Sequence, residues 1–156
     1  RPSEKFPTLE VRIPDMCTRV EEALCLVALV QAISAKLVQL RLAHRTWPIH
    51  RKNLLDENKW RAVRYGINEQ LIDFGKAKEV PFPTLIEEIL AWIDDVVDEL
   101  DSRKEIEYVY TILSQGTSAD RQLAVYRRTG DFKAVVDHVM EETQESLHTN
   151  SDVSSK

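Results

Sequence analysis

Polar and apolar residues alternate over residues 8–13, close to the start of the chain. Side chains two positions apart in a strand point to the same face, so the pattern predicts a strand with one apolar face and one polar face. Glu10 and Arg12 share the polar face, about 6 to 7 Å apart along the strand. We expect the other face to be buried; it consists of Leu9, Val11 and Ile13.

The next segment predicts a long helix that is buried at the centre of the fold. Residues 23–35 are apolar on nearly every side. Thr18 followed by Glu21 has the spacing of an N-terminal capping box, so the helix is expected to run from Thr18 to about Leu42. A membrane span requires about 20 apolar residues. Charged residues bracket a shorter run here, and we expect no membrane segment; they are Glu21, Glu22, Lys36 and Arg41.

The remaining patterns predict helices and one small hairpin. A helix at 51–65 ends at Gly66, a residue type that favours helix C-termini. Residues 71–74 and 79–81 predict two short strands about a turn that contains Gly75. The later helical patterns cover residues 84–100, 102–114, 118–129 and 132–146. The fold class is therefore mainly α, as an α+β fragment with one N-terminal strand, a helical bundle and a small β-hairpin.

Length and charge narrow the possible functions. A chain of 156 residues is expected to form one domain over residues 1–147, followed by a polar, disordered tail at 148–156. A net charge of -5 argues against a general nucleic-acid-binding protein, which usually carries an excess of basic residues. Cys17 and Cys25 are predicted to be reduced thiols, which favours a cytoplasmic location.

Three blocks of the sequence resemble a known family. They match, in family order, the bacterial carboxylate-amine ligases of the glutamate-cysteine ligase type 2 family, within the glutamine synthetase-like superfamily. In that superfamily a Glu-x-Arg pair precedes Pro-Asp and a long helix on the last catalytic strand. Because the family places most of its sheet before this strand, we expect the chain to be the C-terminal portion of a larger ligase. The blocks are Arg1–Asp15, Glu57–Gly66 and Gly116–Asp131.

The resemblance implies roles for five residues. Glu10 corresponds to a magnesium ligand, and Arg12 to a catalytic arginine that stabilises the transferring phosphoryl group. Arg1, Arg61 and Arg64 are candidate cofactor-binding residues that contact the nucleotide or a substrate anion. The implied cofactors are ATP and Mg²⁺. The implied reaction joins a carboxylate, expected to be that of glutamate, to an amine through an acyl phosphate.

Each of these candidate residues also has a structural interpretation. Glu10 and Arg12 could form an exposed ion pair, and Arg61 and Arg64 could hold their helix in place. The alternative to a ligase is a non-catalytic helical interaction module that binds a partner through an unpaired strand edge. As a ligase, the isolated chain is expected to be inactive, because one glutamate cannot hold a magnesium-nucleotide complex. Its expected partners are the missing N-terminal half, a partner chain or a second copy.

Overall fold

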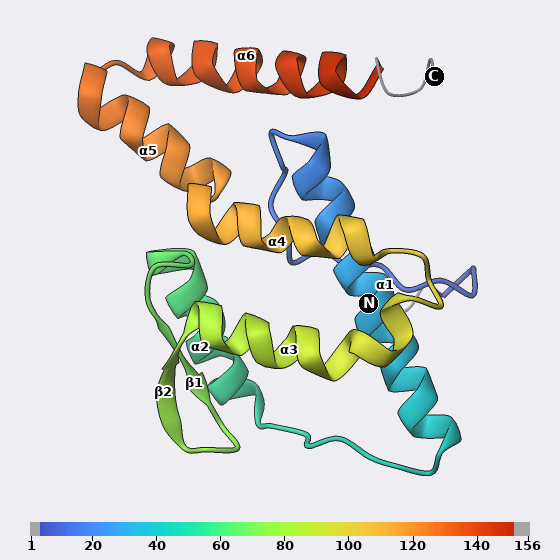
Figure 1. Ribbon diagram of the computed structural model, residues 1–156. Coiled ribbons are helices and arrows are strands. Elements are labelled where there is room, and N and C mark those ends of the chain that lie inside the picture. Colours follow the sequence, from blue (N-terminus) through green and yellow to red (C-terminus); the bar gives the residue numbers. More distant parts are fainter. Residues whose placement is uncertain (1–3, 152–156) are drawn as a thin grey trace.

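The structure, a computed structural model, describes residues 4–151, and it describes side chains up to residue 147. Its described part is mostly helical, with one two-stranded antiparallel hairpin, as the sequence predicted (Figure 1). The elements are α1 (Val20–Leu42), α2 (Lys52–Tyr65), β1 (Gln70–Asp73), β2 (Lys78–Pro81), α3 (Phe82–Val97), α4 (Arg103–Gln115), α5 (Ser118–Thr129) and α6 (Phe132–Ser151).

The hydrophobic core lies where α1 crosses α3 and α4 (Figure 1). Ala28 and Ala32 of α1 are buried at this crossing, and Ile93 of α3 is fully buried beside them. The small alanine side chains allow the helix backbones to approach closely, so that the larger side chains of the two other helices fill the space. The other buried members of this cluster are Val96, Val97 and Ile106.

The hairpin and α2 form a unit beside this core. No residue of α2 is buried, and a side-chain amide joins the helix to the hairpin. The Asn58 amide nitrogen donates to the Ile72 carbonyl at 2.9 Å, and the Ile72 amide donates to the Asn58 side-chain oxygen at 2.8 Å. Asn58 therefore bonds both backbone groups of one residue in β1, as a neighbouring strand would.

The expected strand at residues 8–13 is not formed. Only Leu9 takes part in an isolated bridge, and the rest of the segment is irregular. A strand needs a neighbour to bond its backbone groups, and the only sheet in the described residues is the β1–β2 hairpin. The predicted burial of its apolar face is also wrong, because Leu9, Val11 and Ile13 are 63%, 44% and 80% exposed.

Helix α1 differs from its prediction at its start and in its burial. It begins at Val20 after Arg19, and no side chain caps it, so the predicted capping box of Thr18 and Glu21 is absent. Its outer face is open, with Val27 65% and Val38 57% exposed. By length and composition α1 could cross a membrane, a test that the core helix of a water-soluble protein also passes.

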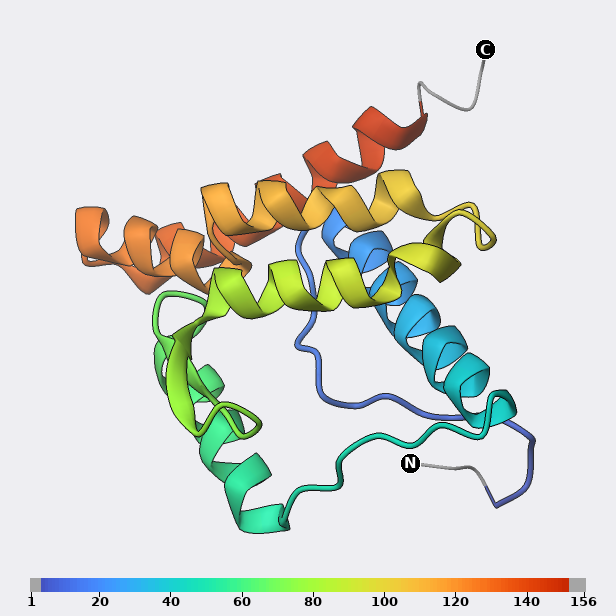
Figure 2. The same cartoon turned by 60° about the horizontal axis from the view of Figure 1, so that its bottom comes forward.

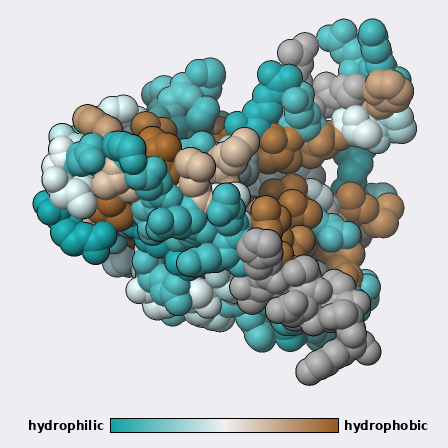
Figure 3. Space-filling model, turned by 90° about the horizontal axis from the view of Figure 1, so that it is seen from above, coloured by the Kyte–Doolittle hydropathy of each residue, from teal (hydrophilic) through white to brown (hydrophobic). Residues whose placement is uncertain are grey.

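The C-terminal helix is longer than the sequence indicated. Helix α6 continues to Ser151, so residues 148–151 are helical where a tail was predicted. Residues 152–156, the rest of that predicted tail, lie outside the described residues. Helix α5 leads away from the core (Figure 1), and α6 runs back to the start of α1, where the Val20 amide donates to the Ser146 hydroxyl. Figure 3 shows hydrophobic surface between polar regions on the face seen from above (Figure 3). On α6, the apolar side chains of Val136 and Met140 are 56% and 55% exposed.

Candidate functional site

Glu10 and Arg12 form a solvent-exposed ion pair in the irregular N-terminal segment. The Arg12 Nε lies 2.7 Å from Glu10 Oε1, and their side chains are 69% and 51% exposed, respectively. The sequence therefore correctly placed an acid and a base side by side, although no strand holds them. Among the side chains that the structure describes, residues 4–147, there is no group of three that could bind a metal ion. Arg1, the other candidate in this segment, lies outside the described residues.

The two candidate arginines of α2 have different surroundings. Arg61 pairs with Glu57 at 2.9 Å and with Glu79 at 2.8 Å, so it ties α2 to β2. The hydrogen bonds that Arg61 donates to Glu57 and then to Glu79 raise the pKa of Arg61 above its ordinary value. Two carboxylates already occupy this guanidinium, which makes it a brace between helix and hairpin in this structure.

Arg64 has no carboxylate partner within the described part of the chain. Its guanidinium lies over the ring of Tyr65, 5.6 Å from the centroid. Trp60 packs edge-on against the same ring at 5.7 Å, and both aromatic side chains are partly exposed. A guanidinium on an aromatic face keeps its hydrogen-bond donors available for an anion. Of the two arginines, Arg64 is the one that an anionic ligand could reach.

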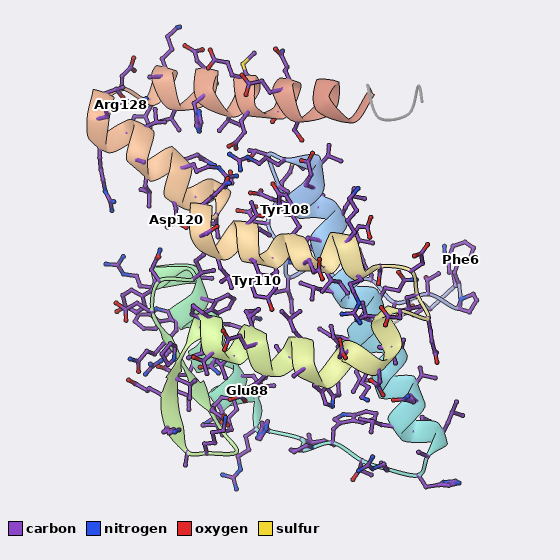
Figure 4. All side chains as sticks on the ribbon, in the orientation of Figure 1. Phe6, Glu88, Tyr108, Tyr110, Asp120 and Arg128 are labelled. Carbon is purple, nitrogen blue, oxygen red and sulfur yellow. The ribbon has the colours of Figure 1, made fainter. Side chains whose placement is uncertain are left out.

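The turn between α4 and α5 is a rigid junction. Gly116 adopts φ +82°, and a Cβ there would meet the Asp120 Cβ at 2.9 Å, so only glycine fits. Thr117 caps α5, and its backbone and side chain donate to Asp120 Oδ2 at 2.8 and 2.7 Å. Asn68 donates to Asp120 Oδ1 at 2.8 Å, which joins the loop after α2 to this turn. Figure 4 shows Asp120 at the α4–α5 corner.

Arg121 is the centre of a buried ionic cluster that starts at this turn. Its Nη2 lies 2.7 Å from Glu22 Oε1 on α1, and its Nε lies 2.7 Å from Glu142 Oε1 on α6. Its Nη1 donates to the Gly116 carbonyl at 2.7 Å. The three side chains are nearly buried, at 12%, 7% and 8% exposure for Arg121, Glu22 and Glu142. One guanidinium thus holds three helices together.

The residues that precede α1 complete the cluster. Arg19 pairs with Glu142 at 3.0 Å and donates to Gln115 at 2.8 Å. Thr18 donates to the Glu142 carboxylate and lies 3.1 Å from the Ser118 hydroxyl. Thr18, predicted as a helix cap, therefore bonds α6 instead.

Two carboxylates in and beside the cluster have lowered pKa values, those of Glu142 and Asp120. Burial acts to raise the pKa of Glu142, but the hydrogen bonds from Thr18 and Arg121 and the charges of Arg121 and Arg19 outweigh it. The same balance lowers the pKa of Asp120, where bonds from Thr117 and Asn68 oppose burial. Both carboxylates stay ionised at neutral pH.

The two thiols have no catalytic environment. Burial raises the pKa of Cys25 to about 11, with smaller contributions from Cys17 and Glu22. Burial also raises the pKa of Cys17, which is only partly exposed. Both cysteines are free, as the sequence predicted. A thiol that is protonated at neutral pH is a poor nucleophile, so neither is a candidate catalytic residue.

The family match covers nearly the whole chain. The model for the glutamate-cysteine ligase family 2 (GCS2) matches residues 1–138. The chain belongs to this family. No solved structure matches it significantly.

Bacterial relatives of this GCS2 chain are about half identical to it. Proteins named "Putative glutamate--cysteine ligase 2" from Chloroflexus aggregans and Solibacter usitatus are each 52% identical over 147 residues. The protein of the same name from Herpetosiphon aurantiacus is 47% identical over the same length. Each alignment covers 94% of this chain and 38% of the relative, so the chain spans less than two fifths of their length.

The third GCS2-like block contacts the residues that follow each of the other two blocks. The Gly116–Asp131 block contacts the residues just after the first block through Arg121 and Thr18. It contacts the loop just after the second block through Asp120 and Asn68. Sequence reasoning left this third block without a role. The Thr117-x-x-Asp120 spacing was a signal for its capping box, but no local pattern indicates the partners of Arg121, which lie 99 and 21 residues away.

Proposed function

We propose that this chain is the C-terminal portion of an ATP-dependent carboxylate-amine ligase that joins glutamate to an amine through an acyl phosphate. The GCS2 match and the names of the relatives support the ligase class, and the 38% coverage supports a portion of a larger protein. The observation that carries the proposal is the exposed Glu10–Arg12 pair in the family's Glu-x-Arg block. Cytoplasmic location is proposed with it, because both cysteines are free.

Glu10 and Arg12 fit complementary parts of a magnesium-nucleotide complex. The Glu10 carboxylate is half exposed and can supply one oxygen ligand to Mg²⁺. Arg12 can stabilise negative charge on a phosphoryl group. Their mutual ion pair holds the two groups in place without ligand at little energetic cost, since exposed pairs are weak. Arg64 is the better candidate for a second anion contact than Arg61, which is braced by Glu57 and Glu79.

The remaining ligands must come from elsewhere, because no set of three metal-binding side chains forms among residues 4–147. We infer that the preceding part of the ligase supplies them and covers the apolar side chains beside the ion pair. Leu9 and Ile13 are the most exposed of these, at 63% and 80%. A neighbouring strand there would complete the strand that the sequence predicts at residues 8–13.

The test compares this chain alone and together with the preceding part of the Chloroflexus aggregans relative. Alone, it should not release ADP from Mg²⁺-ATP with glutamate and an amine; together, the two parts should do so. Glu10→Gln should abolish release, whereas Glu141→Gln on the exposed surface of α6 should leave it unchanged. ADP release by the isolated chain, or full activity of Glu10→Gln, would contradict the proposal.

The second candidate is a non-catalytic interaction module derived from such a ligase. The observation that favours it is α2, a helix without a single buried residue and with Trp60 54% and Val63 88% exposed. In that case the two parts would associate without nucleotide turnover. Association of the two unaltered parts without ADP release would favour the module, whereas ADP release that Glu10→Gln abolishes would favour the ligase.

A further inference from the structure

An open groove lies between α3 and α4, on the far side of the core from α1. Its floor includes Val97 and Ile106, which also contact the α1 alanines, together with Leu90. The groove has a volume of about 300 Å³. Such a space accepts one or two large side chains, and Tyr110 stands at its edge on the side of α4 that faces α3 (Figure 4).

The walls of this α3–α4 groove are acidic. Glu87 from α3 and Glu107 from α4 lie on opposite sides, and neither forms an ion pair or hydrogen bond with another described residue. Asp94 also lines it but is paired with Arg103 at 3.0 Å. Three carboxylates against one guanidinium give the groove a negative charge. An apolar floor between unpaired carboxylates is complementary to a segment with apolar side chains flanked by positive charges.

The chain itself contains one such segment, residues 41–52, which we call the basic segment. It holds four basic residues and no acidic ones, in a protein whose net charge is -5. Residues 41–49 are all exposed, and the three large apolar side chains Leu42, Trp47 and Ile49 are 76%, 43% and 93% exposed. Its basic residues are Arg41, Arg45, Arg51 and Lys52.

The basic segment does not occupy the groove of its own molecule. In both ribbon views it links α1 to α2 along the side of α3 that faces away from α4 (Figures 1 and 2). Arg45 and Arg51 have no carboxylate partner among the side chains of residues 4–147, while Lys52 pairs locally with Asp56. A second molecule can therefore present this segment to the groove.

We propose that two copies of the chain form a dimer in which the basic segment of each occupies the α3–α4 groove of the other. Trp47 or Ile49 would fill the apolar floor, and Arg45 and Arg51 would pair with Glu87 and Glu107. The exchange is reciprocal, so a two-fold axis closes the assembly and gives two equal contacts. This contact is separate from the Glu10–Arg12 site, and it does not depend on the proposed ligase activity.

The test measures the mass in solution by sedimentation equilibrium over a range of protein concentrations. The unaltered chain should reach twice 18.0 kDa, and the dimer should weaken as salt screens the charges. Glu87→Arg with Glu107→Arg should raise the dimer dissociation constant about tenfold or more, because like charges then face each other. Arg45→Glu with Arg51→Glu should do the same. A mixture of these two double variants should associate as a heterodimer, because both contacts then join opposite charges: one contact is native, and the other has its charges exchanged.

A matched control reverses two acidic residues outside the groove, Asp137→Arg with Glu141→Arg on α6, and should leave the dimer unchanged. Circular dichroism checks that every variant is folded, and recovery in the mixture is itself evidence of folding. A chain that stays at 18.0 kDa at all concentrations would overturn the proposal. A dimer that neither reversal weakens would also overturn it and would assign self-association to another surface, such as the exposed apolar residues 9–13.

Discussion

Arg121 and Arg103 make the same kind of contact in opposite environments. Each guanidinium lies between two carboxylates, Glu22 and Glu142 for Arg121 and Asp94 and Asp98 for Arg103. The Arg103 side chain is 44% exposed, whereas that of Arg121 is 12% exposed. Water screens the first cluster but not the second, so only the second leaves uncompensated buried charge when the arginine is removed.

Arg121→Gln should therefore lower the free energy of unfolding by about 3 kcal/mol, since two carboxylates lose their cation in a buried site. Arg103→Gln is the matched control and should change it little. Urea unfolding followed by circular dichroism measures both. Equal losses in the two variants would mean that burial does not strengthen the Arg121 cluster.

Among the elements, the helices were predictable and the N-terminal strand was not. Periodicity identifies α2 and α5 within a residue of their ends, because caps such as Gly66 and Thr117 act locally. The strand at residues 8–13 depends on a neighbouring strand that the described residues do not contain. For the same reason Glu10 and Arg12 could be placed together from their spacing, but the cluster around Arg121 could not, since its members are far apart in sequence.

Asn58 links α2 to β1 through two hydrogen bonds, in addition to the Arg61 contact with β2, and this role was not evident from sequence. Asn58→Asp keeps the acceptor for the Ile72 amide but sets a carboxylate oxygen against the Ile72 carbonyl. We expect a loss of about 1–3 kcal/mol in the local stability of the hairpin, because the carbonyl loses its donor. Hydrogen exchange at the Ile72 amide measures it, with Asn53→Asp at an exposed position of α2 as the control. Unchanged protection at Ile72 would show that the strand pairing alone holds β1.

The whole molecule has one small core with two peripheral units attached to it. The core joins α1, α3 and α4, the hairpin holds α2, and the Arg121 cluster fastens α6 to α1. Local stability follows the number of buried contacts, so these parts should open at different free energies. Helix α2, with no buried residue, should exchange its amide hydrogens much faster than the core segments of α1 and α4.

Two substitutions that shorten a side chain to alanine test whether the core and α2 unfold separately. Ile93 is fully buried, and Ile93→Ala should lower the free energy of global unfolding by about 2–5 kcal/mol and speed exchange throughout the core helices. Leu55 on α2 is 45% exposed, and Leu55→Ala should change global unfolding by less than about 0.5 kcal/mol. Hydrogen exchange detected by mass spectrometry measures the exchange rates of the helices. Urea unfolding measures the free energy of global unfolding. If α2 exchanged as slowly as α4, or if Leu55→Ala weakened the core, the molecule would unfold as a single unit, and α2 would not be free to pack against another part of the ligase.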